Sequence, residues 1–288
     1  MRIPDWIIDG LKERERSKDL LVFLKDNGIV TICEEAKCPN IGTCFSKKTA
    51  TFLIMGSICT RNCNFCAVTS GIPHPLSEDE PTKVAETVKT LGIRHTVITS
   101  VTRDDLEDGG ASHFVKTIRA VRAINSSVTV EMLIPDFDGN ISSVDEIIKE
   151  YPEVINHNIE TVKELYNEVR PKADYSRSLK LLLRVNQKSD RITAKSGMMV
   201  GLGETEEQVY KTMDDLLNAG VQILTIGQYL RPTNKHHEIK RFVTPEEFNR
   251  YREVGLEKGF TGVASGPFVR SSYLAKEMYE EARSKQGM

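Results

Sequence analysis

The sequence predicts an α/β fold built around a parallel sheet, with an extension at each end. Three observations lead to this prediction. Six apolar runs rich in β-forming residues occur between positions 49 and 230, and stretches of helical composition separate them. Hydrophobic residues make up 39% of the 288 residues, which is enough for a sizeable core. Strands that alternate with helices form βαβ units, whose strands run parallel.

Six such units fall short of the complete (β/α)8 barrel. We therefore expect a partial (β/α)6 TIM-like barrel, with a flavodoxin-like open sheet as the main alternative. The expected strands are TATFLIMG (49–56), RHTVITSV (94–101), SVTVEMLIP (127–135), EVINHNIE (153–160), ITAKSGMMVGLG (192–203, with its loop) and VQILTIGQYL (221–230).

Helices are expected before and between these strands. Their ranges are 4–27, 78–92, 113–125, 144–151, 161–188 with a break near Pro171, and 205–220. Gly28 and Gly220 stand where two of these helices should stop, as glycine commonly does after a helix.

Both extensions have features of their own. Residues 30–49 are expected to form a loop-rich segment. The C-terminal part adds a helix after Thr244, a short stretch at 263–266 and a last helix that opens near Ser271. We accordingly divide the chain into an N-terminal extension (1–48), a barrel (49–230) and a C-terminal extension (231–288).

Charge and hydropathy exclude several classes of protein. The 39 basic and 41 acidic residues give a net charge of −2, which argues against a protein that mainly holds nucleic acid. No apolar run approaches the roughly 18 residues of a membrane span. The start, MRIPDWIIDGLKERER, lacks the basic and apolar regions of a secretory signal. We expect a cytoplasmic location.

All six cysteines lie between Cys33 and Cys66, in two triplets. Clustered cysteines in a reducing compartment more often bind metal than form disulfides. Since no cysteine is left over, two metal sites explain the pattern better than one site with spare thiols.

The second triplet, CTRNCNFC (59–66), spaces its cysteines by three and two residues. Iron–sulfur clusters usually have four cysteine ligands, so three thiolates leave one iron of a [4Fe–4S] cluster open. A structural zinc site needs a fourth protein ligand. His74 is the nearest candidate, but prolines flank it on both sides. The zinc alternative therefore stays open but is the poorer explanation.

This motif, placed directly after the first strand and with Phe65 before its last cysteine, resembles the radical S-adenosylmethionine (SAM) superfamily. The resemblance implies that Cys59, Cys63 and Cys66 hold a [4Fe–4S] cluster. In that superfamily SAM chelates the open iron, and its reductive cleavage yields a 5′-deoxyadenosyl radical that abstracts hydrogen from carbon.

The first triplet, CEEAKCPNIGTC, spaces its cysteines by four and five residues. Together with RSSY (270–273) it resembles the lipoyl synthase family of that superfamily, as do VTSVTRDDLEDGGA (98–111), NHNIET (156–161), KSGMMVGLGE (195–204) and QYLRPT (228–233). The resemblance implies a second [4Fe–4S] cluster on Cys33, Cys38, Cys44 and Ser272. Without it, the serines of RSSY would be taken for helix caps.

The resemblance also implies an activity and partners. The activity is the insertion of two sulfur atoms, at C6 and C8, into an octanoyl group on a lysine of a lipoyl carrier domain. Such domains belong to the E2 subunits of 2-oxoacid dehydrogenases and to the H protein of glycine cleavage. Electrons would come from a ferredoxin or flavodoxin, and iron–sulfur carrier proteins would rebuild the consumed cluster.

Five further residues are candidate SAM contacts. Gly201 follows the fifth strand, where glycine lets a ligand approach the backbone. Asn158 and Glu160 alternate along the fourth strand and so should share one face. Arg184 matches a carboxylate, although a surface ion pair explains it better. Arg103 lies in the acidic loop TRDDLEDGG, which is also explained as a solvated turn.

Two rival functions remain at this point. Another radical SAM enzyme could use its second cluster only for electron transfer. A zinc-stabilised binding module without catalysis would use the same cysteines for structural metal.

Overall fold

The computed structural model describes residues 3–11, 18–46 and 50–285, in two compact units. The first unit comprises Met1–Asn62 and Ala67–Glu153, and the second comprises Cys63–Cys66 and Val154–Met288. Among the described residues, no helix has the length and apolar character needed to cross a membrane.

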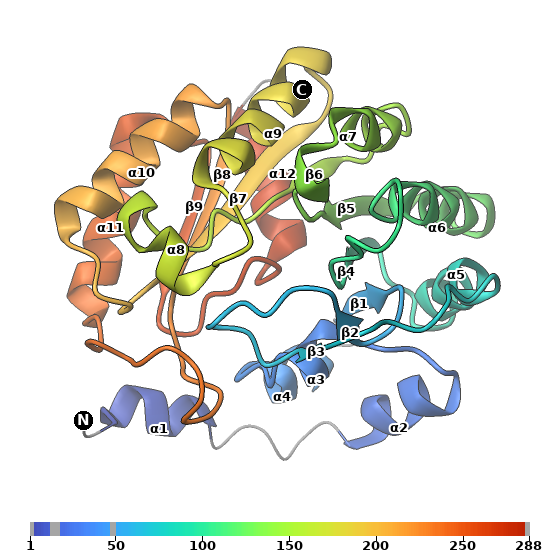
Figure 1. The fold of residues 1–288 in the computed structure, drawn as a ribbon, viewed down its shortest axis with the longest axis horizontal. Helices are drawn as coiled ribbons and strands as arrows, with labels where there is room; N and C mark the ends of the chain where they lie inside the picture. Colours follow the sequence, from blue (N-terminus) through green and yellow to red (C-terminus); the bar gives the residue numbers. More distant parts are fainter. Residues whose placement is uncertain (1–2, 12–17, 47–49, 286–288) are drawn as a thin grey trace. The chain divides into compact units, whose positions relative to one another are not determined.

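The first unit contains three parallel strands in the order β1 (Thr51–Ile54), β4 (His95–Ser100) and β5 (Thr129–Leu133). Its helices α5 (Glu80–Thr90), α6 (Ala111–Ile124) and α7 (Ile141–Ile148) lie on one side of these strands (Figure 1). Along α6, Phe114, Ile118 and Val121 are buried at the four- and three-residue spacing of one helical face. This face explains why the segment folds as a helix against the strands.

Smaller elements complete the first unit. Near the N-terminus lie α1 (Asp5–Leu11), α2 (Lys18–Asp26), α3 (Ile32–Glu35) and α4 (Ile41–Ser46). A two-residue parallel ladder joins β2 (Ile58–Cys59) to β3 (Thr69–Ser70), and the 3-10 turn η2 (Phe137–Gly139) precedes α7.

The second unit contains four parallel strands in the order β6 (Val154–Asn156), β7 (Thr193–Val200), β8 (Ile223–Gln228) and β9 (Gly262–Gly266). Its helical elements are η3 (Lys163–Leu165), α8 (Tyr166–Val169), α9 (Tyr175–Lys188), α10 (Glu206–Asn218), α11 (Pro245–Lys258) and α12 (Ala275–Lys285).

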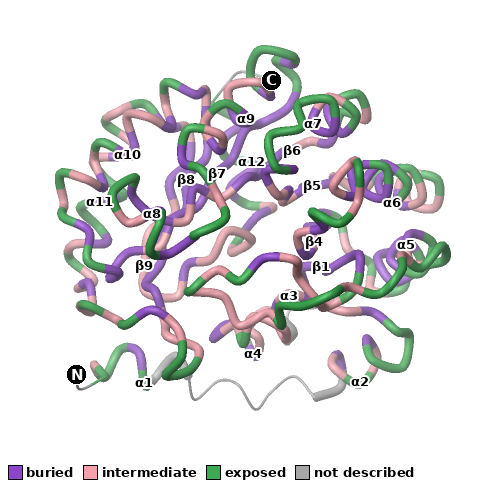
Figure 2. The backbone as a smooth tube through the Cα atoms, in the orientation of Figure 1, coloured by how far each residue is buried: buried purple, intermediate pink, exposed green. Residues whose placement is uncertain are grey.

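The core of the second unit forms where α10 and α11 pack on β7 and β8. Val209, Met213 and Leu216 of α10 meet Leu224 and Ile226 of β8 in one buried cluster. In Figure 2 the strands β1, β4, β6, β7 and β8 are buried at nearly every position, whereas the helices alternate between buried and exposed positions. Capping boxes start α10 at Thr205 and α11 at Thr244, each satisfying backbone donors that a helix leaves open.

Six strands expected from the sequence are present, although β6 ends at Asn156 and not at 160. The short stretch at 263–266 is a seventh strand, β9, which pairs with β8. Part of the expected first strand, residue 49, lies outside the described residues.

Two expectations about helical segments were wrong in detail, and a third is tested only in part. The segment expected as loop at 30–49 contains α3 and α4, each too short to show a periodic pattern. Of the helix expected over 4–27, the described residues contain α1 and α2, and the part of that expectation that falls on residues 12–17 lies outside the described residues. The last helix begins at Ala275 and not near Ser271.

Candidate active site

The first half of the cysteine loop is tied to the segment that follows β4. The sulfur of Cys59 accepts hydrogen bonds from the backbone N–H of Arg61, at 3.4 Å, and of Thr102, at 3.3 Å. Thr60 donates from its N–H and its hydroxyl to the carbonyl of Thr102, at 3.1 and 3.0 Å. Asp104 returns a bond from its N–H to the Thr60 hydroxyl at 3.1 Å. The sulfur of Cys59 therefore lies in a fixed, donor-rich setting.

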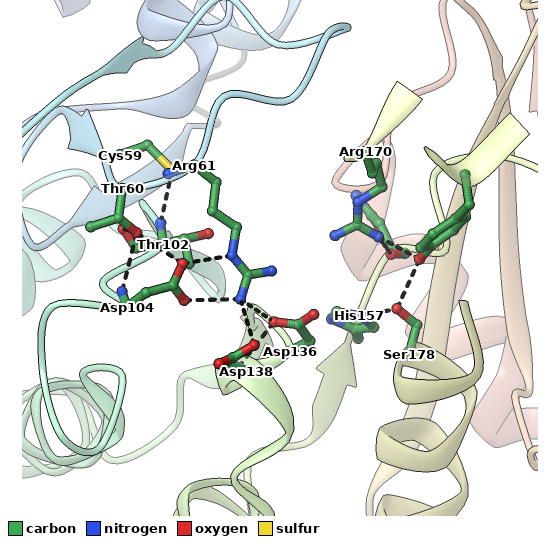
Figure 3. A network of polar contacts seen from close by, with 12 residues as sticks. Cys59, Thr60, Arg61, Thr102, Asp104, Asp136, Asp138, His157, Arg170 and Ser178 are labelled. Atoms are coloured by element: carbon green, nitrogen blue, oxygen red, sulfur yellow. Dashed lines mark hydrogen bonds and ion pairs between the residues drawn. The ribbon is translucent and has the colours of Figure 1, made fainter. Parts of the chain in front are cut away.

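The guanidinium of Arg61 lies in a cluster of carboxylates (Figure 3). It binds Asp104 through two parallel bonds of 2.8 and 2.9 Å. Its Nη2 also lies 2.7 Å from Asp136 and 4.0 Å from Asp138. Burial lowers the pKa of Arg61. The hydrogen bonds that Arg61 donates to Asp104 and Asp136 raise it by a larger amount, so that the net pKa lies above its ordinary value. Our sequence interpretation overlooked this residue.

Arg103 does not extend freely from the acidic loop. Its side chain is only 3% exposed and forms a bidentate pair with Asp105, with bonds of 2.8 and 2.9 Å. That pairing is the leading cause of the lowered pKa of Asp105. Asp108 in the same loop accepts from the N–H groups of Gly110 and Ser112 at 2.8 Å and so begins α6. Arg103, Asp105 and Asp108 in this loop are therefore held by specific contacts within the protein.

The second half of the loop, Cys63–Cys66, is held within the second unit. Asn64 donates from its backbone N–H to Val169 at 3.0 Å and from its side chain to Glu168 at 2.6 Å, and its carbonyl accepts from the N–H of His237 at 2.8 Å. Nε2 of His236 donates to the carbonyl of Cys66, also at 2.8 Å. Neither histidine was singled out from the sequence.

The packing of Phe65 explains why the residue before Cys66 is aromatic. Its ring packs against a buried cluster of Val169, Leu202 and Tyr229. The apolar contact complements the backbone bonds of Asn64 and fixes the course of the loop between Cys63 and Cys66.

Asn158 and Glu160 lie together, but not for the reason expected. Because β6 ends at Asn156, strand alternation does not apply. Instead, Glu160 adopts a φ of 66°, its backbone bonds to Gly197 and Met199 of β7, and its Oε1 accepts from the Asn158 side chain at 3.1 Å. Burial raises the pKa of Glu160, while Arg170 and Asn158 act against that rise.

A chain of buried polar contacts supports this pair (Figure 3). Nη1 of Arg170 donates to the carbonyl of Asn158 at 3.1 Å and to the hydroxyl of Tyr166 at 2.7 Å. The Tyr166 hydroxyl bonds to Ser178 at 2.8 Å, and Ser178 bonds to Nε2 of His157 at 3.0 Å. His157 is thus part of a buried hydrogen-bond chain, and Arg170 holds the backbone of Asn158.

The RSSY turn packs closely on the strands of the second unit. A Cβ at Gly197 of β7 would lie 2.6 Å from Oγ1 of Thr225, 2.9 Å from Oδ1 of Asn158 and 3.4 Å from Cβ of Ser271. A Cβ at Gly227 of β8 would collide with the carbonyl of Val269. Two glycines therefore make room for the turn beside Asn158.

Neither serine of RSSY lies directly before the last helix. Because α12 begins at Ala275, the capping position is Leu274, and Ser271 and Ser272 belong to the preceding turn. Ser272 is half-buried there. Neither serine therefore stands at the position that helix capping would require.

The first triplet occupies a compact segment of the first unit. Cys33 lies on α3 and Cys44 on α4, and the N–H of Cys38 bonds to the carbonyl of Cys33 at 2.9 Å. Burial raises the pKa of the Cys33 thiol to about 12, and the nearby Cys38 adds to the effect. All six cysteines are free thiols.

The remaining candidates are placed as follows. Gly201, with a φ of 94°, directly follows β7, and its N–H donates to Glu204 at 2.6 Å. Arg184 is half-buried on α9. His74, the alternative zinc ligand, is exposed. Within the described ranges, no three His, Cys, Asp or Glu side chains are already arranged as ligands of one metal ion.

The donor chemistry nevertheless fits an iron–sulfur cluster and SAM. Reduced thiols in the two triplets are the ligands that such clusters require. Oδ1 of Asn158 is buried and has no hydrogen-bond partner among the described residues, so it offers an acceptor to a ligand's amino or hydroxyl group.

Comparisons with known proteins agree with these features. The family model described as the radical SAM superfamily matches residues 53–216. Among solved structures, the hydrogenase maturase HydG has a TM-score of 0.61 at 14% identity, over 97% of this chain and 70% of that one. Streptococcus suis SuiB bound to S-adenosylmethionine has a TM-score of 0.58 at 12% identity, over 79% and 53%. These likenesses confirm the predicted partial-barrel fold class.

Sequence relatives are more specific. A lipoyl synthase of Caldanaerobacter subterraneus is 56% identical over 96% of both chains. A lipoyl synthase of Chlorobaculum tepidum is 52% identical over 95% of this chain and 94% of its own. Membership of the superfamily implies SAM and a [4Fe–4S] cluster as cofactors. The chain therefore belongs to the lipoyl synthase family of the radical SAM superfamily.

Proposed function

We propose that this chain converts a protein-bound octanoyl group into a lipoyl group by inserting sulfur at C6 and C8. The observation that carries the proposal is the full set of motifs, two cysteine triplets and RSSY, on a chain about half identical to lipoyl synthases over nearly its whole length. Octanoylated proteins are the substrate class that this family membership implies.

We assign the ligands by motif. Cys59, Cys63 and Cys66 hold the cluster that binds SAM, and Cys33, Cys38, Cys44 and Ser272 hold a second [4Fe–4S] cluster. When bound, the first cluster supplies the electron that cleaves SAM, and the second supplies sulfur. An oxygen ligand among thiolates is the weakest link of such a site, which suits a cluster that must come apart.

Several of the chain's own residues would contact SAM. Oδ1 of Asn158 offers a buried acceptor, and Glu160 beside it favours a cationic or hydroxyl group. Arg170 holds the backbone of Asn158 through a hydrogen bond to its carbonyl. Gly201 and Arg184 remain proposed contacts, whereas Arg103 is engaged by Asp105 and would have to exchange that partner to bind SAM.

Partners follow from the same chemistry. We propose lipoyl carrier domains of 2-oxoacid dehydrogenase E2 subunits and of the glycine cleavage H protein as substrates. A ferredoxin or flavodoxin would deliver electrons, and iron–sulfur carrier proteins would rebuild the second cluster after each turnover.

An anaerobic assay tests the proposal. The full chain is reconstituted with iron and sulfide and given an octanoyl-lysine peptide, SAM and a reductant, and products are followed by mass spectrometry. A doubly thiolated peptide with loss of cluster sulfide is expected. Turnover with both clusters intact would favour the electron-transfer rival, and stoichiometric zinc without SAM cleavage would favour the binding module.

The Ser272 assignment has its own test. Ser272→Ala should keep SAM cleavage but lose second-cluster iron more quickly to a chelator, because one of four ligands is missing. Ser284→Ala is the matched control, since Ser284 is an exposed serine on α12. Lipoyl formation by Ser272→Ala at the wild-type rate would refute the assignment.

A further inference from the structure

The Arg61 ion cluster has no part in the function proposed above. Arg61 is not a cysteine ligand, yet its side chain is only 4% exposed and that of Asp136 is fully buried. A buried charge is stable only when other groups compensate it, and Arg61 obtains this from a bidentate bond to Asp104 and a single bond to Asp136. The charged groups of Arg61, Asp104 and Asp136 together therefore fix the position of Arg61 in the cysteine loop.

Both donors to the sulfur of Cys59 depend on this cluster. One donor is the backbone N–H of Arg61 itself. The other is the N–H of Thr102, two residues before Asp104. The ion pair between Arg61 and Asp104 thus joins the two segments that carry the donors, and Thr60 joins them again through its bonds to Thr102 and Asp104.

Hydrogen bonds to a ligating sulfur change the reduction potential of an iron–sulfur cluster. The reduced cluster carries one more negative charge than the oxidised one. An N–H dipole that points at the sulfur therefore stabilises the reduced form more, and the potential rises. Two such bonds converge on Cys59.

We propose that Arg61, acting through Asp104 and Asp136, is a positioning residue that holds two backbone N–H groups on the sulfur of Cys59 and so raises the reduction potential of the cluster on this loop. The inference rests on the proposed function, because it requires that Cys59 ligates a cluster. It assigns a role to a charged side chain that does not itself reach the sulfur through any described hydrogen bond.

The test is a redox titration of the reconstituted full-length protein, followed by electron paramagnetic resonance. The signal that changes on addition of SAM identifies the cluster on Cys59, Cys63 and Cys66. Arg61→Gln removes the charge, and Asp104→Asn is a nearly isosteric second variant. Arg119→Gln is the control, because Arg119 is a largely exposed arginine of the same unit that pairs with Glu150. Iron content is measured for every variant.

In Arg61→Gln we expect wild-type iron content but a lower potential. If the loosened N–H groups make reduction roughly tenfold less favourable, the midpoint falls by about 59 mV for one electron. Asp104→Asn should shift in the same direction, and Arg119→Gln should match the wild type.

Unchanged midpoints in Arg61→Gln and Asp104→Asn, with normal iron, would overturn the inference. If Arg61→Gln takes up no iron, the midpoint of Asp104→Asn decides: a lower value supports the inference, and the wild-type value rejects it. A wild-type protein that binds no iron–sulfur cluster would instead reject the proposed function, so the two failures are distinguishable.

Discussion

The carboxylate of Glu204 organises the loop after β7, and its removal gives a prediction that can be worked out from the structure. Its oxygens accept hydrogen bonds from three successive backbone amides, those of Gly201, Leu202 and Gly203, at 2.6, 2.9 and 3.1 Å. Glu204 is only 6% exposed. Glu204→Ala would leave all three donors without this partner.

The magnitude follows from the burial of the donors. Gly201 and Leu202 are buried, whereas Gly203 is exposed and can bond to water. Each hydrogen bond to a charged group contributes about 1.5–3 kcal/mol, so two lost bonds lower the free energy of unfolding by at least roughly 3 kcal/mol. For a chain of this size that corresponds to a fall of roughly 6–12 °C in melting temperature. Glu204→Gln keeps one acceptor oxygen and should lose about half as much.

Thermal unfolding of the metal-free protein, followed by circular dichroism, measures this change. Glu257→Ala is the control, because Glu257 is an exposed glutamate on α11 of the same unit. Equal melting temperatures for Glu204→Ala and Glu257→Ala would refute the reasoning, since they would mean that water replaces the carboxylate at the buried amides.

Three other predictions concern the same unit. Gly197→Ala should destabilise the apoprotein in urea by about 1–3 kcal/mol, because its Cβ would meet Thr225 at 2.6 Å and Asn158 at 2.9 Å; an unchanged midpoint would count against this packing. Because burial raises the folded-state pKa of Glu160, the wild type should lose stability relative to Glu160→Gln as the pH rises above 4.5, and a difference in melting temperature that stays constant with pH would contradict this. Phe65→Ala should speed the loss of iron to a chelator, since its ring anchors the cysteine loop, and an unaltered rate would show that the backbone bonds suffice.

The sequence predicted the elements whose burial produces a long pattern. The helix α6 and the strand β7 carry enough apolar positions to be recognised. The strand β9, GVASG, has only one branched apolar residue, so its membership of the sheet depends on pairing with β8 and not on its own composition. The helices α3 and α4 are too short for any periodicity.

Within the site, the spacing of residues close in the chain predicted candidate ligands, whereas contacts between distant segments could not be predicted from the sequence. The cysteine triplets are visible because their ligands are close in the chain. Asp104 lies 43 positions from Arg61, and only the fold brings the two together. An arginine between two cysteines of a loop was the one available signal for that contact. Asn158 and Glu160 were expected to share one face of a strand. Their side chains do lie together, but β6 ends at Asn156, so strand alternation is not the reason.

The packing of the RSSY turn has a consequence for how the protein matures. Met278 and Ala282 of α12 pack on Ile223 of β8, and the turn before α12 rests on Gly227 and Gly197. A ribosome delivers the chain from its N-terminus, so the cysteines at 33–66 emerge before this turn at 270–273. If Ser272 completes the second ligand set, a nascent chain offers three thiols and no closing oxygen. Assembly of that cluster is then a step that follows translation.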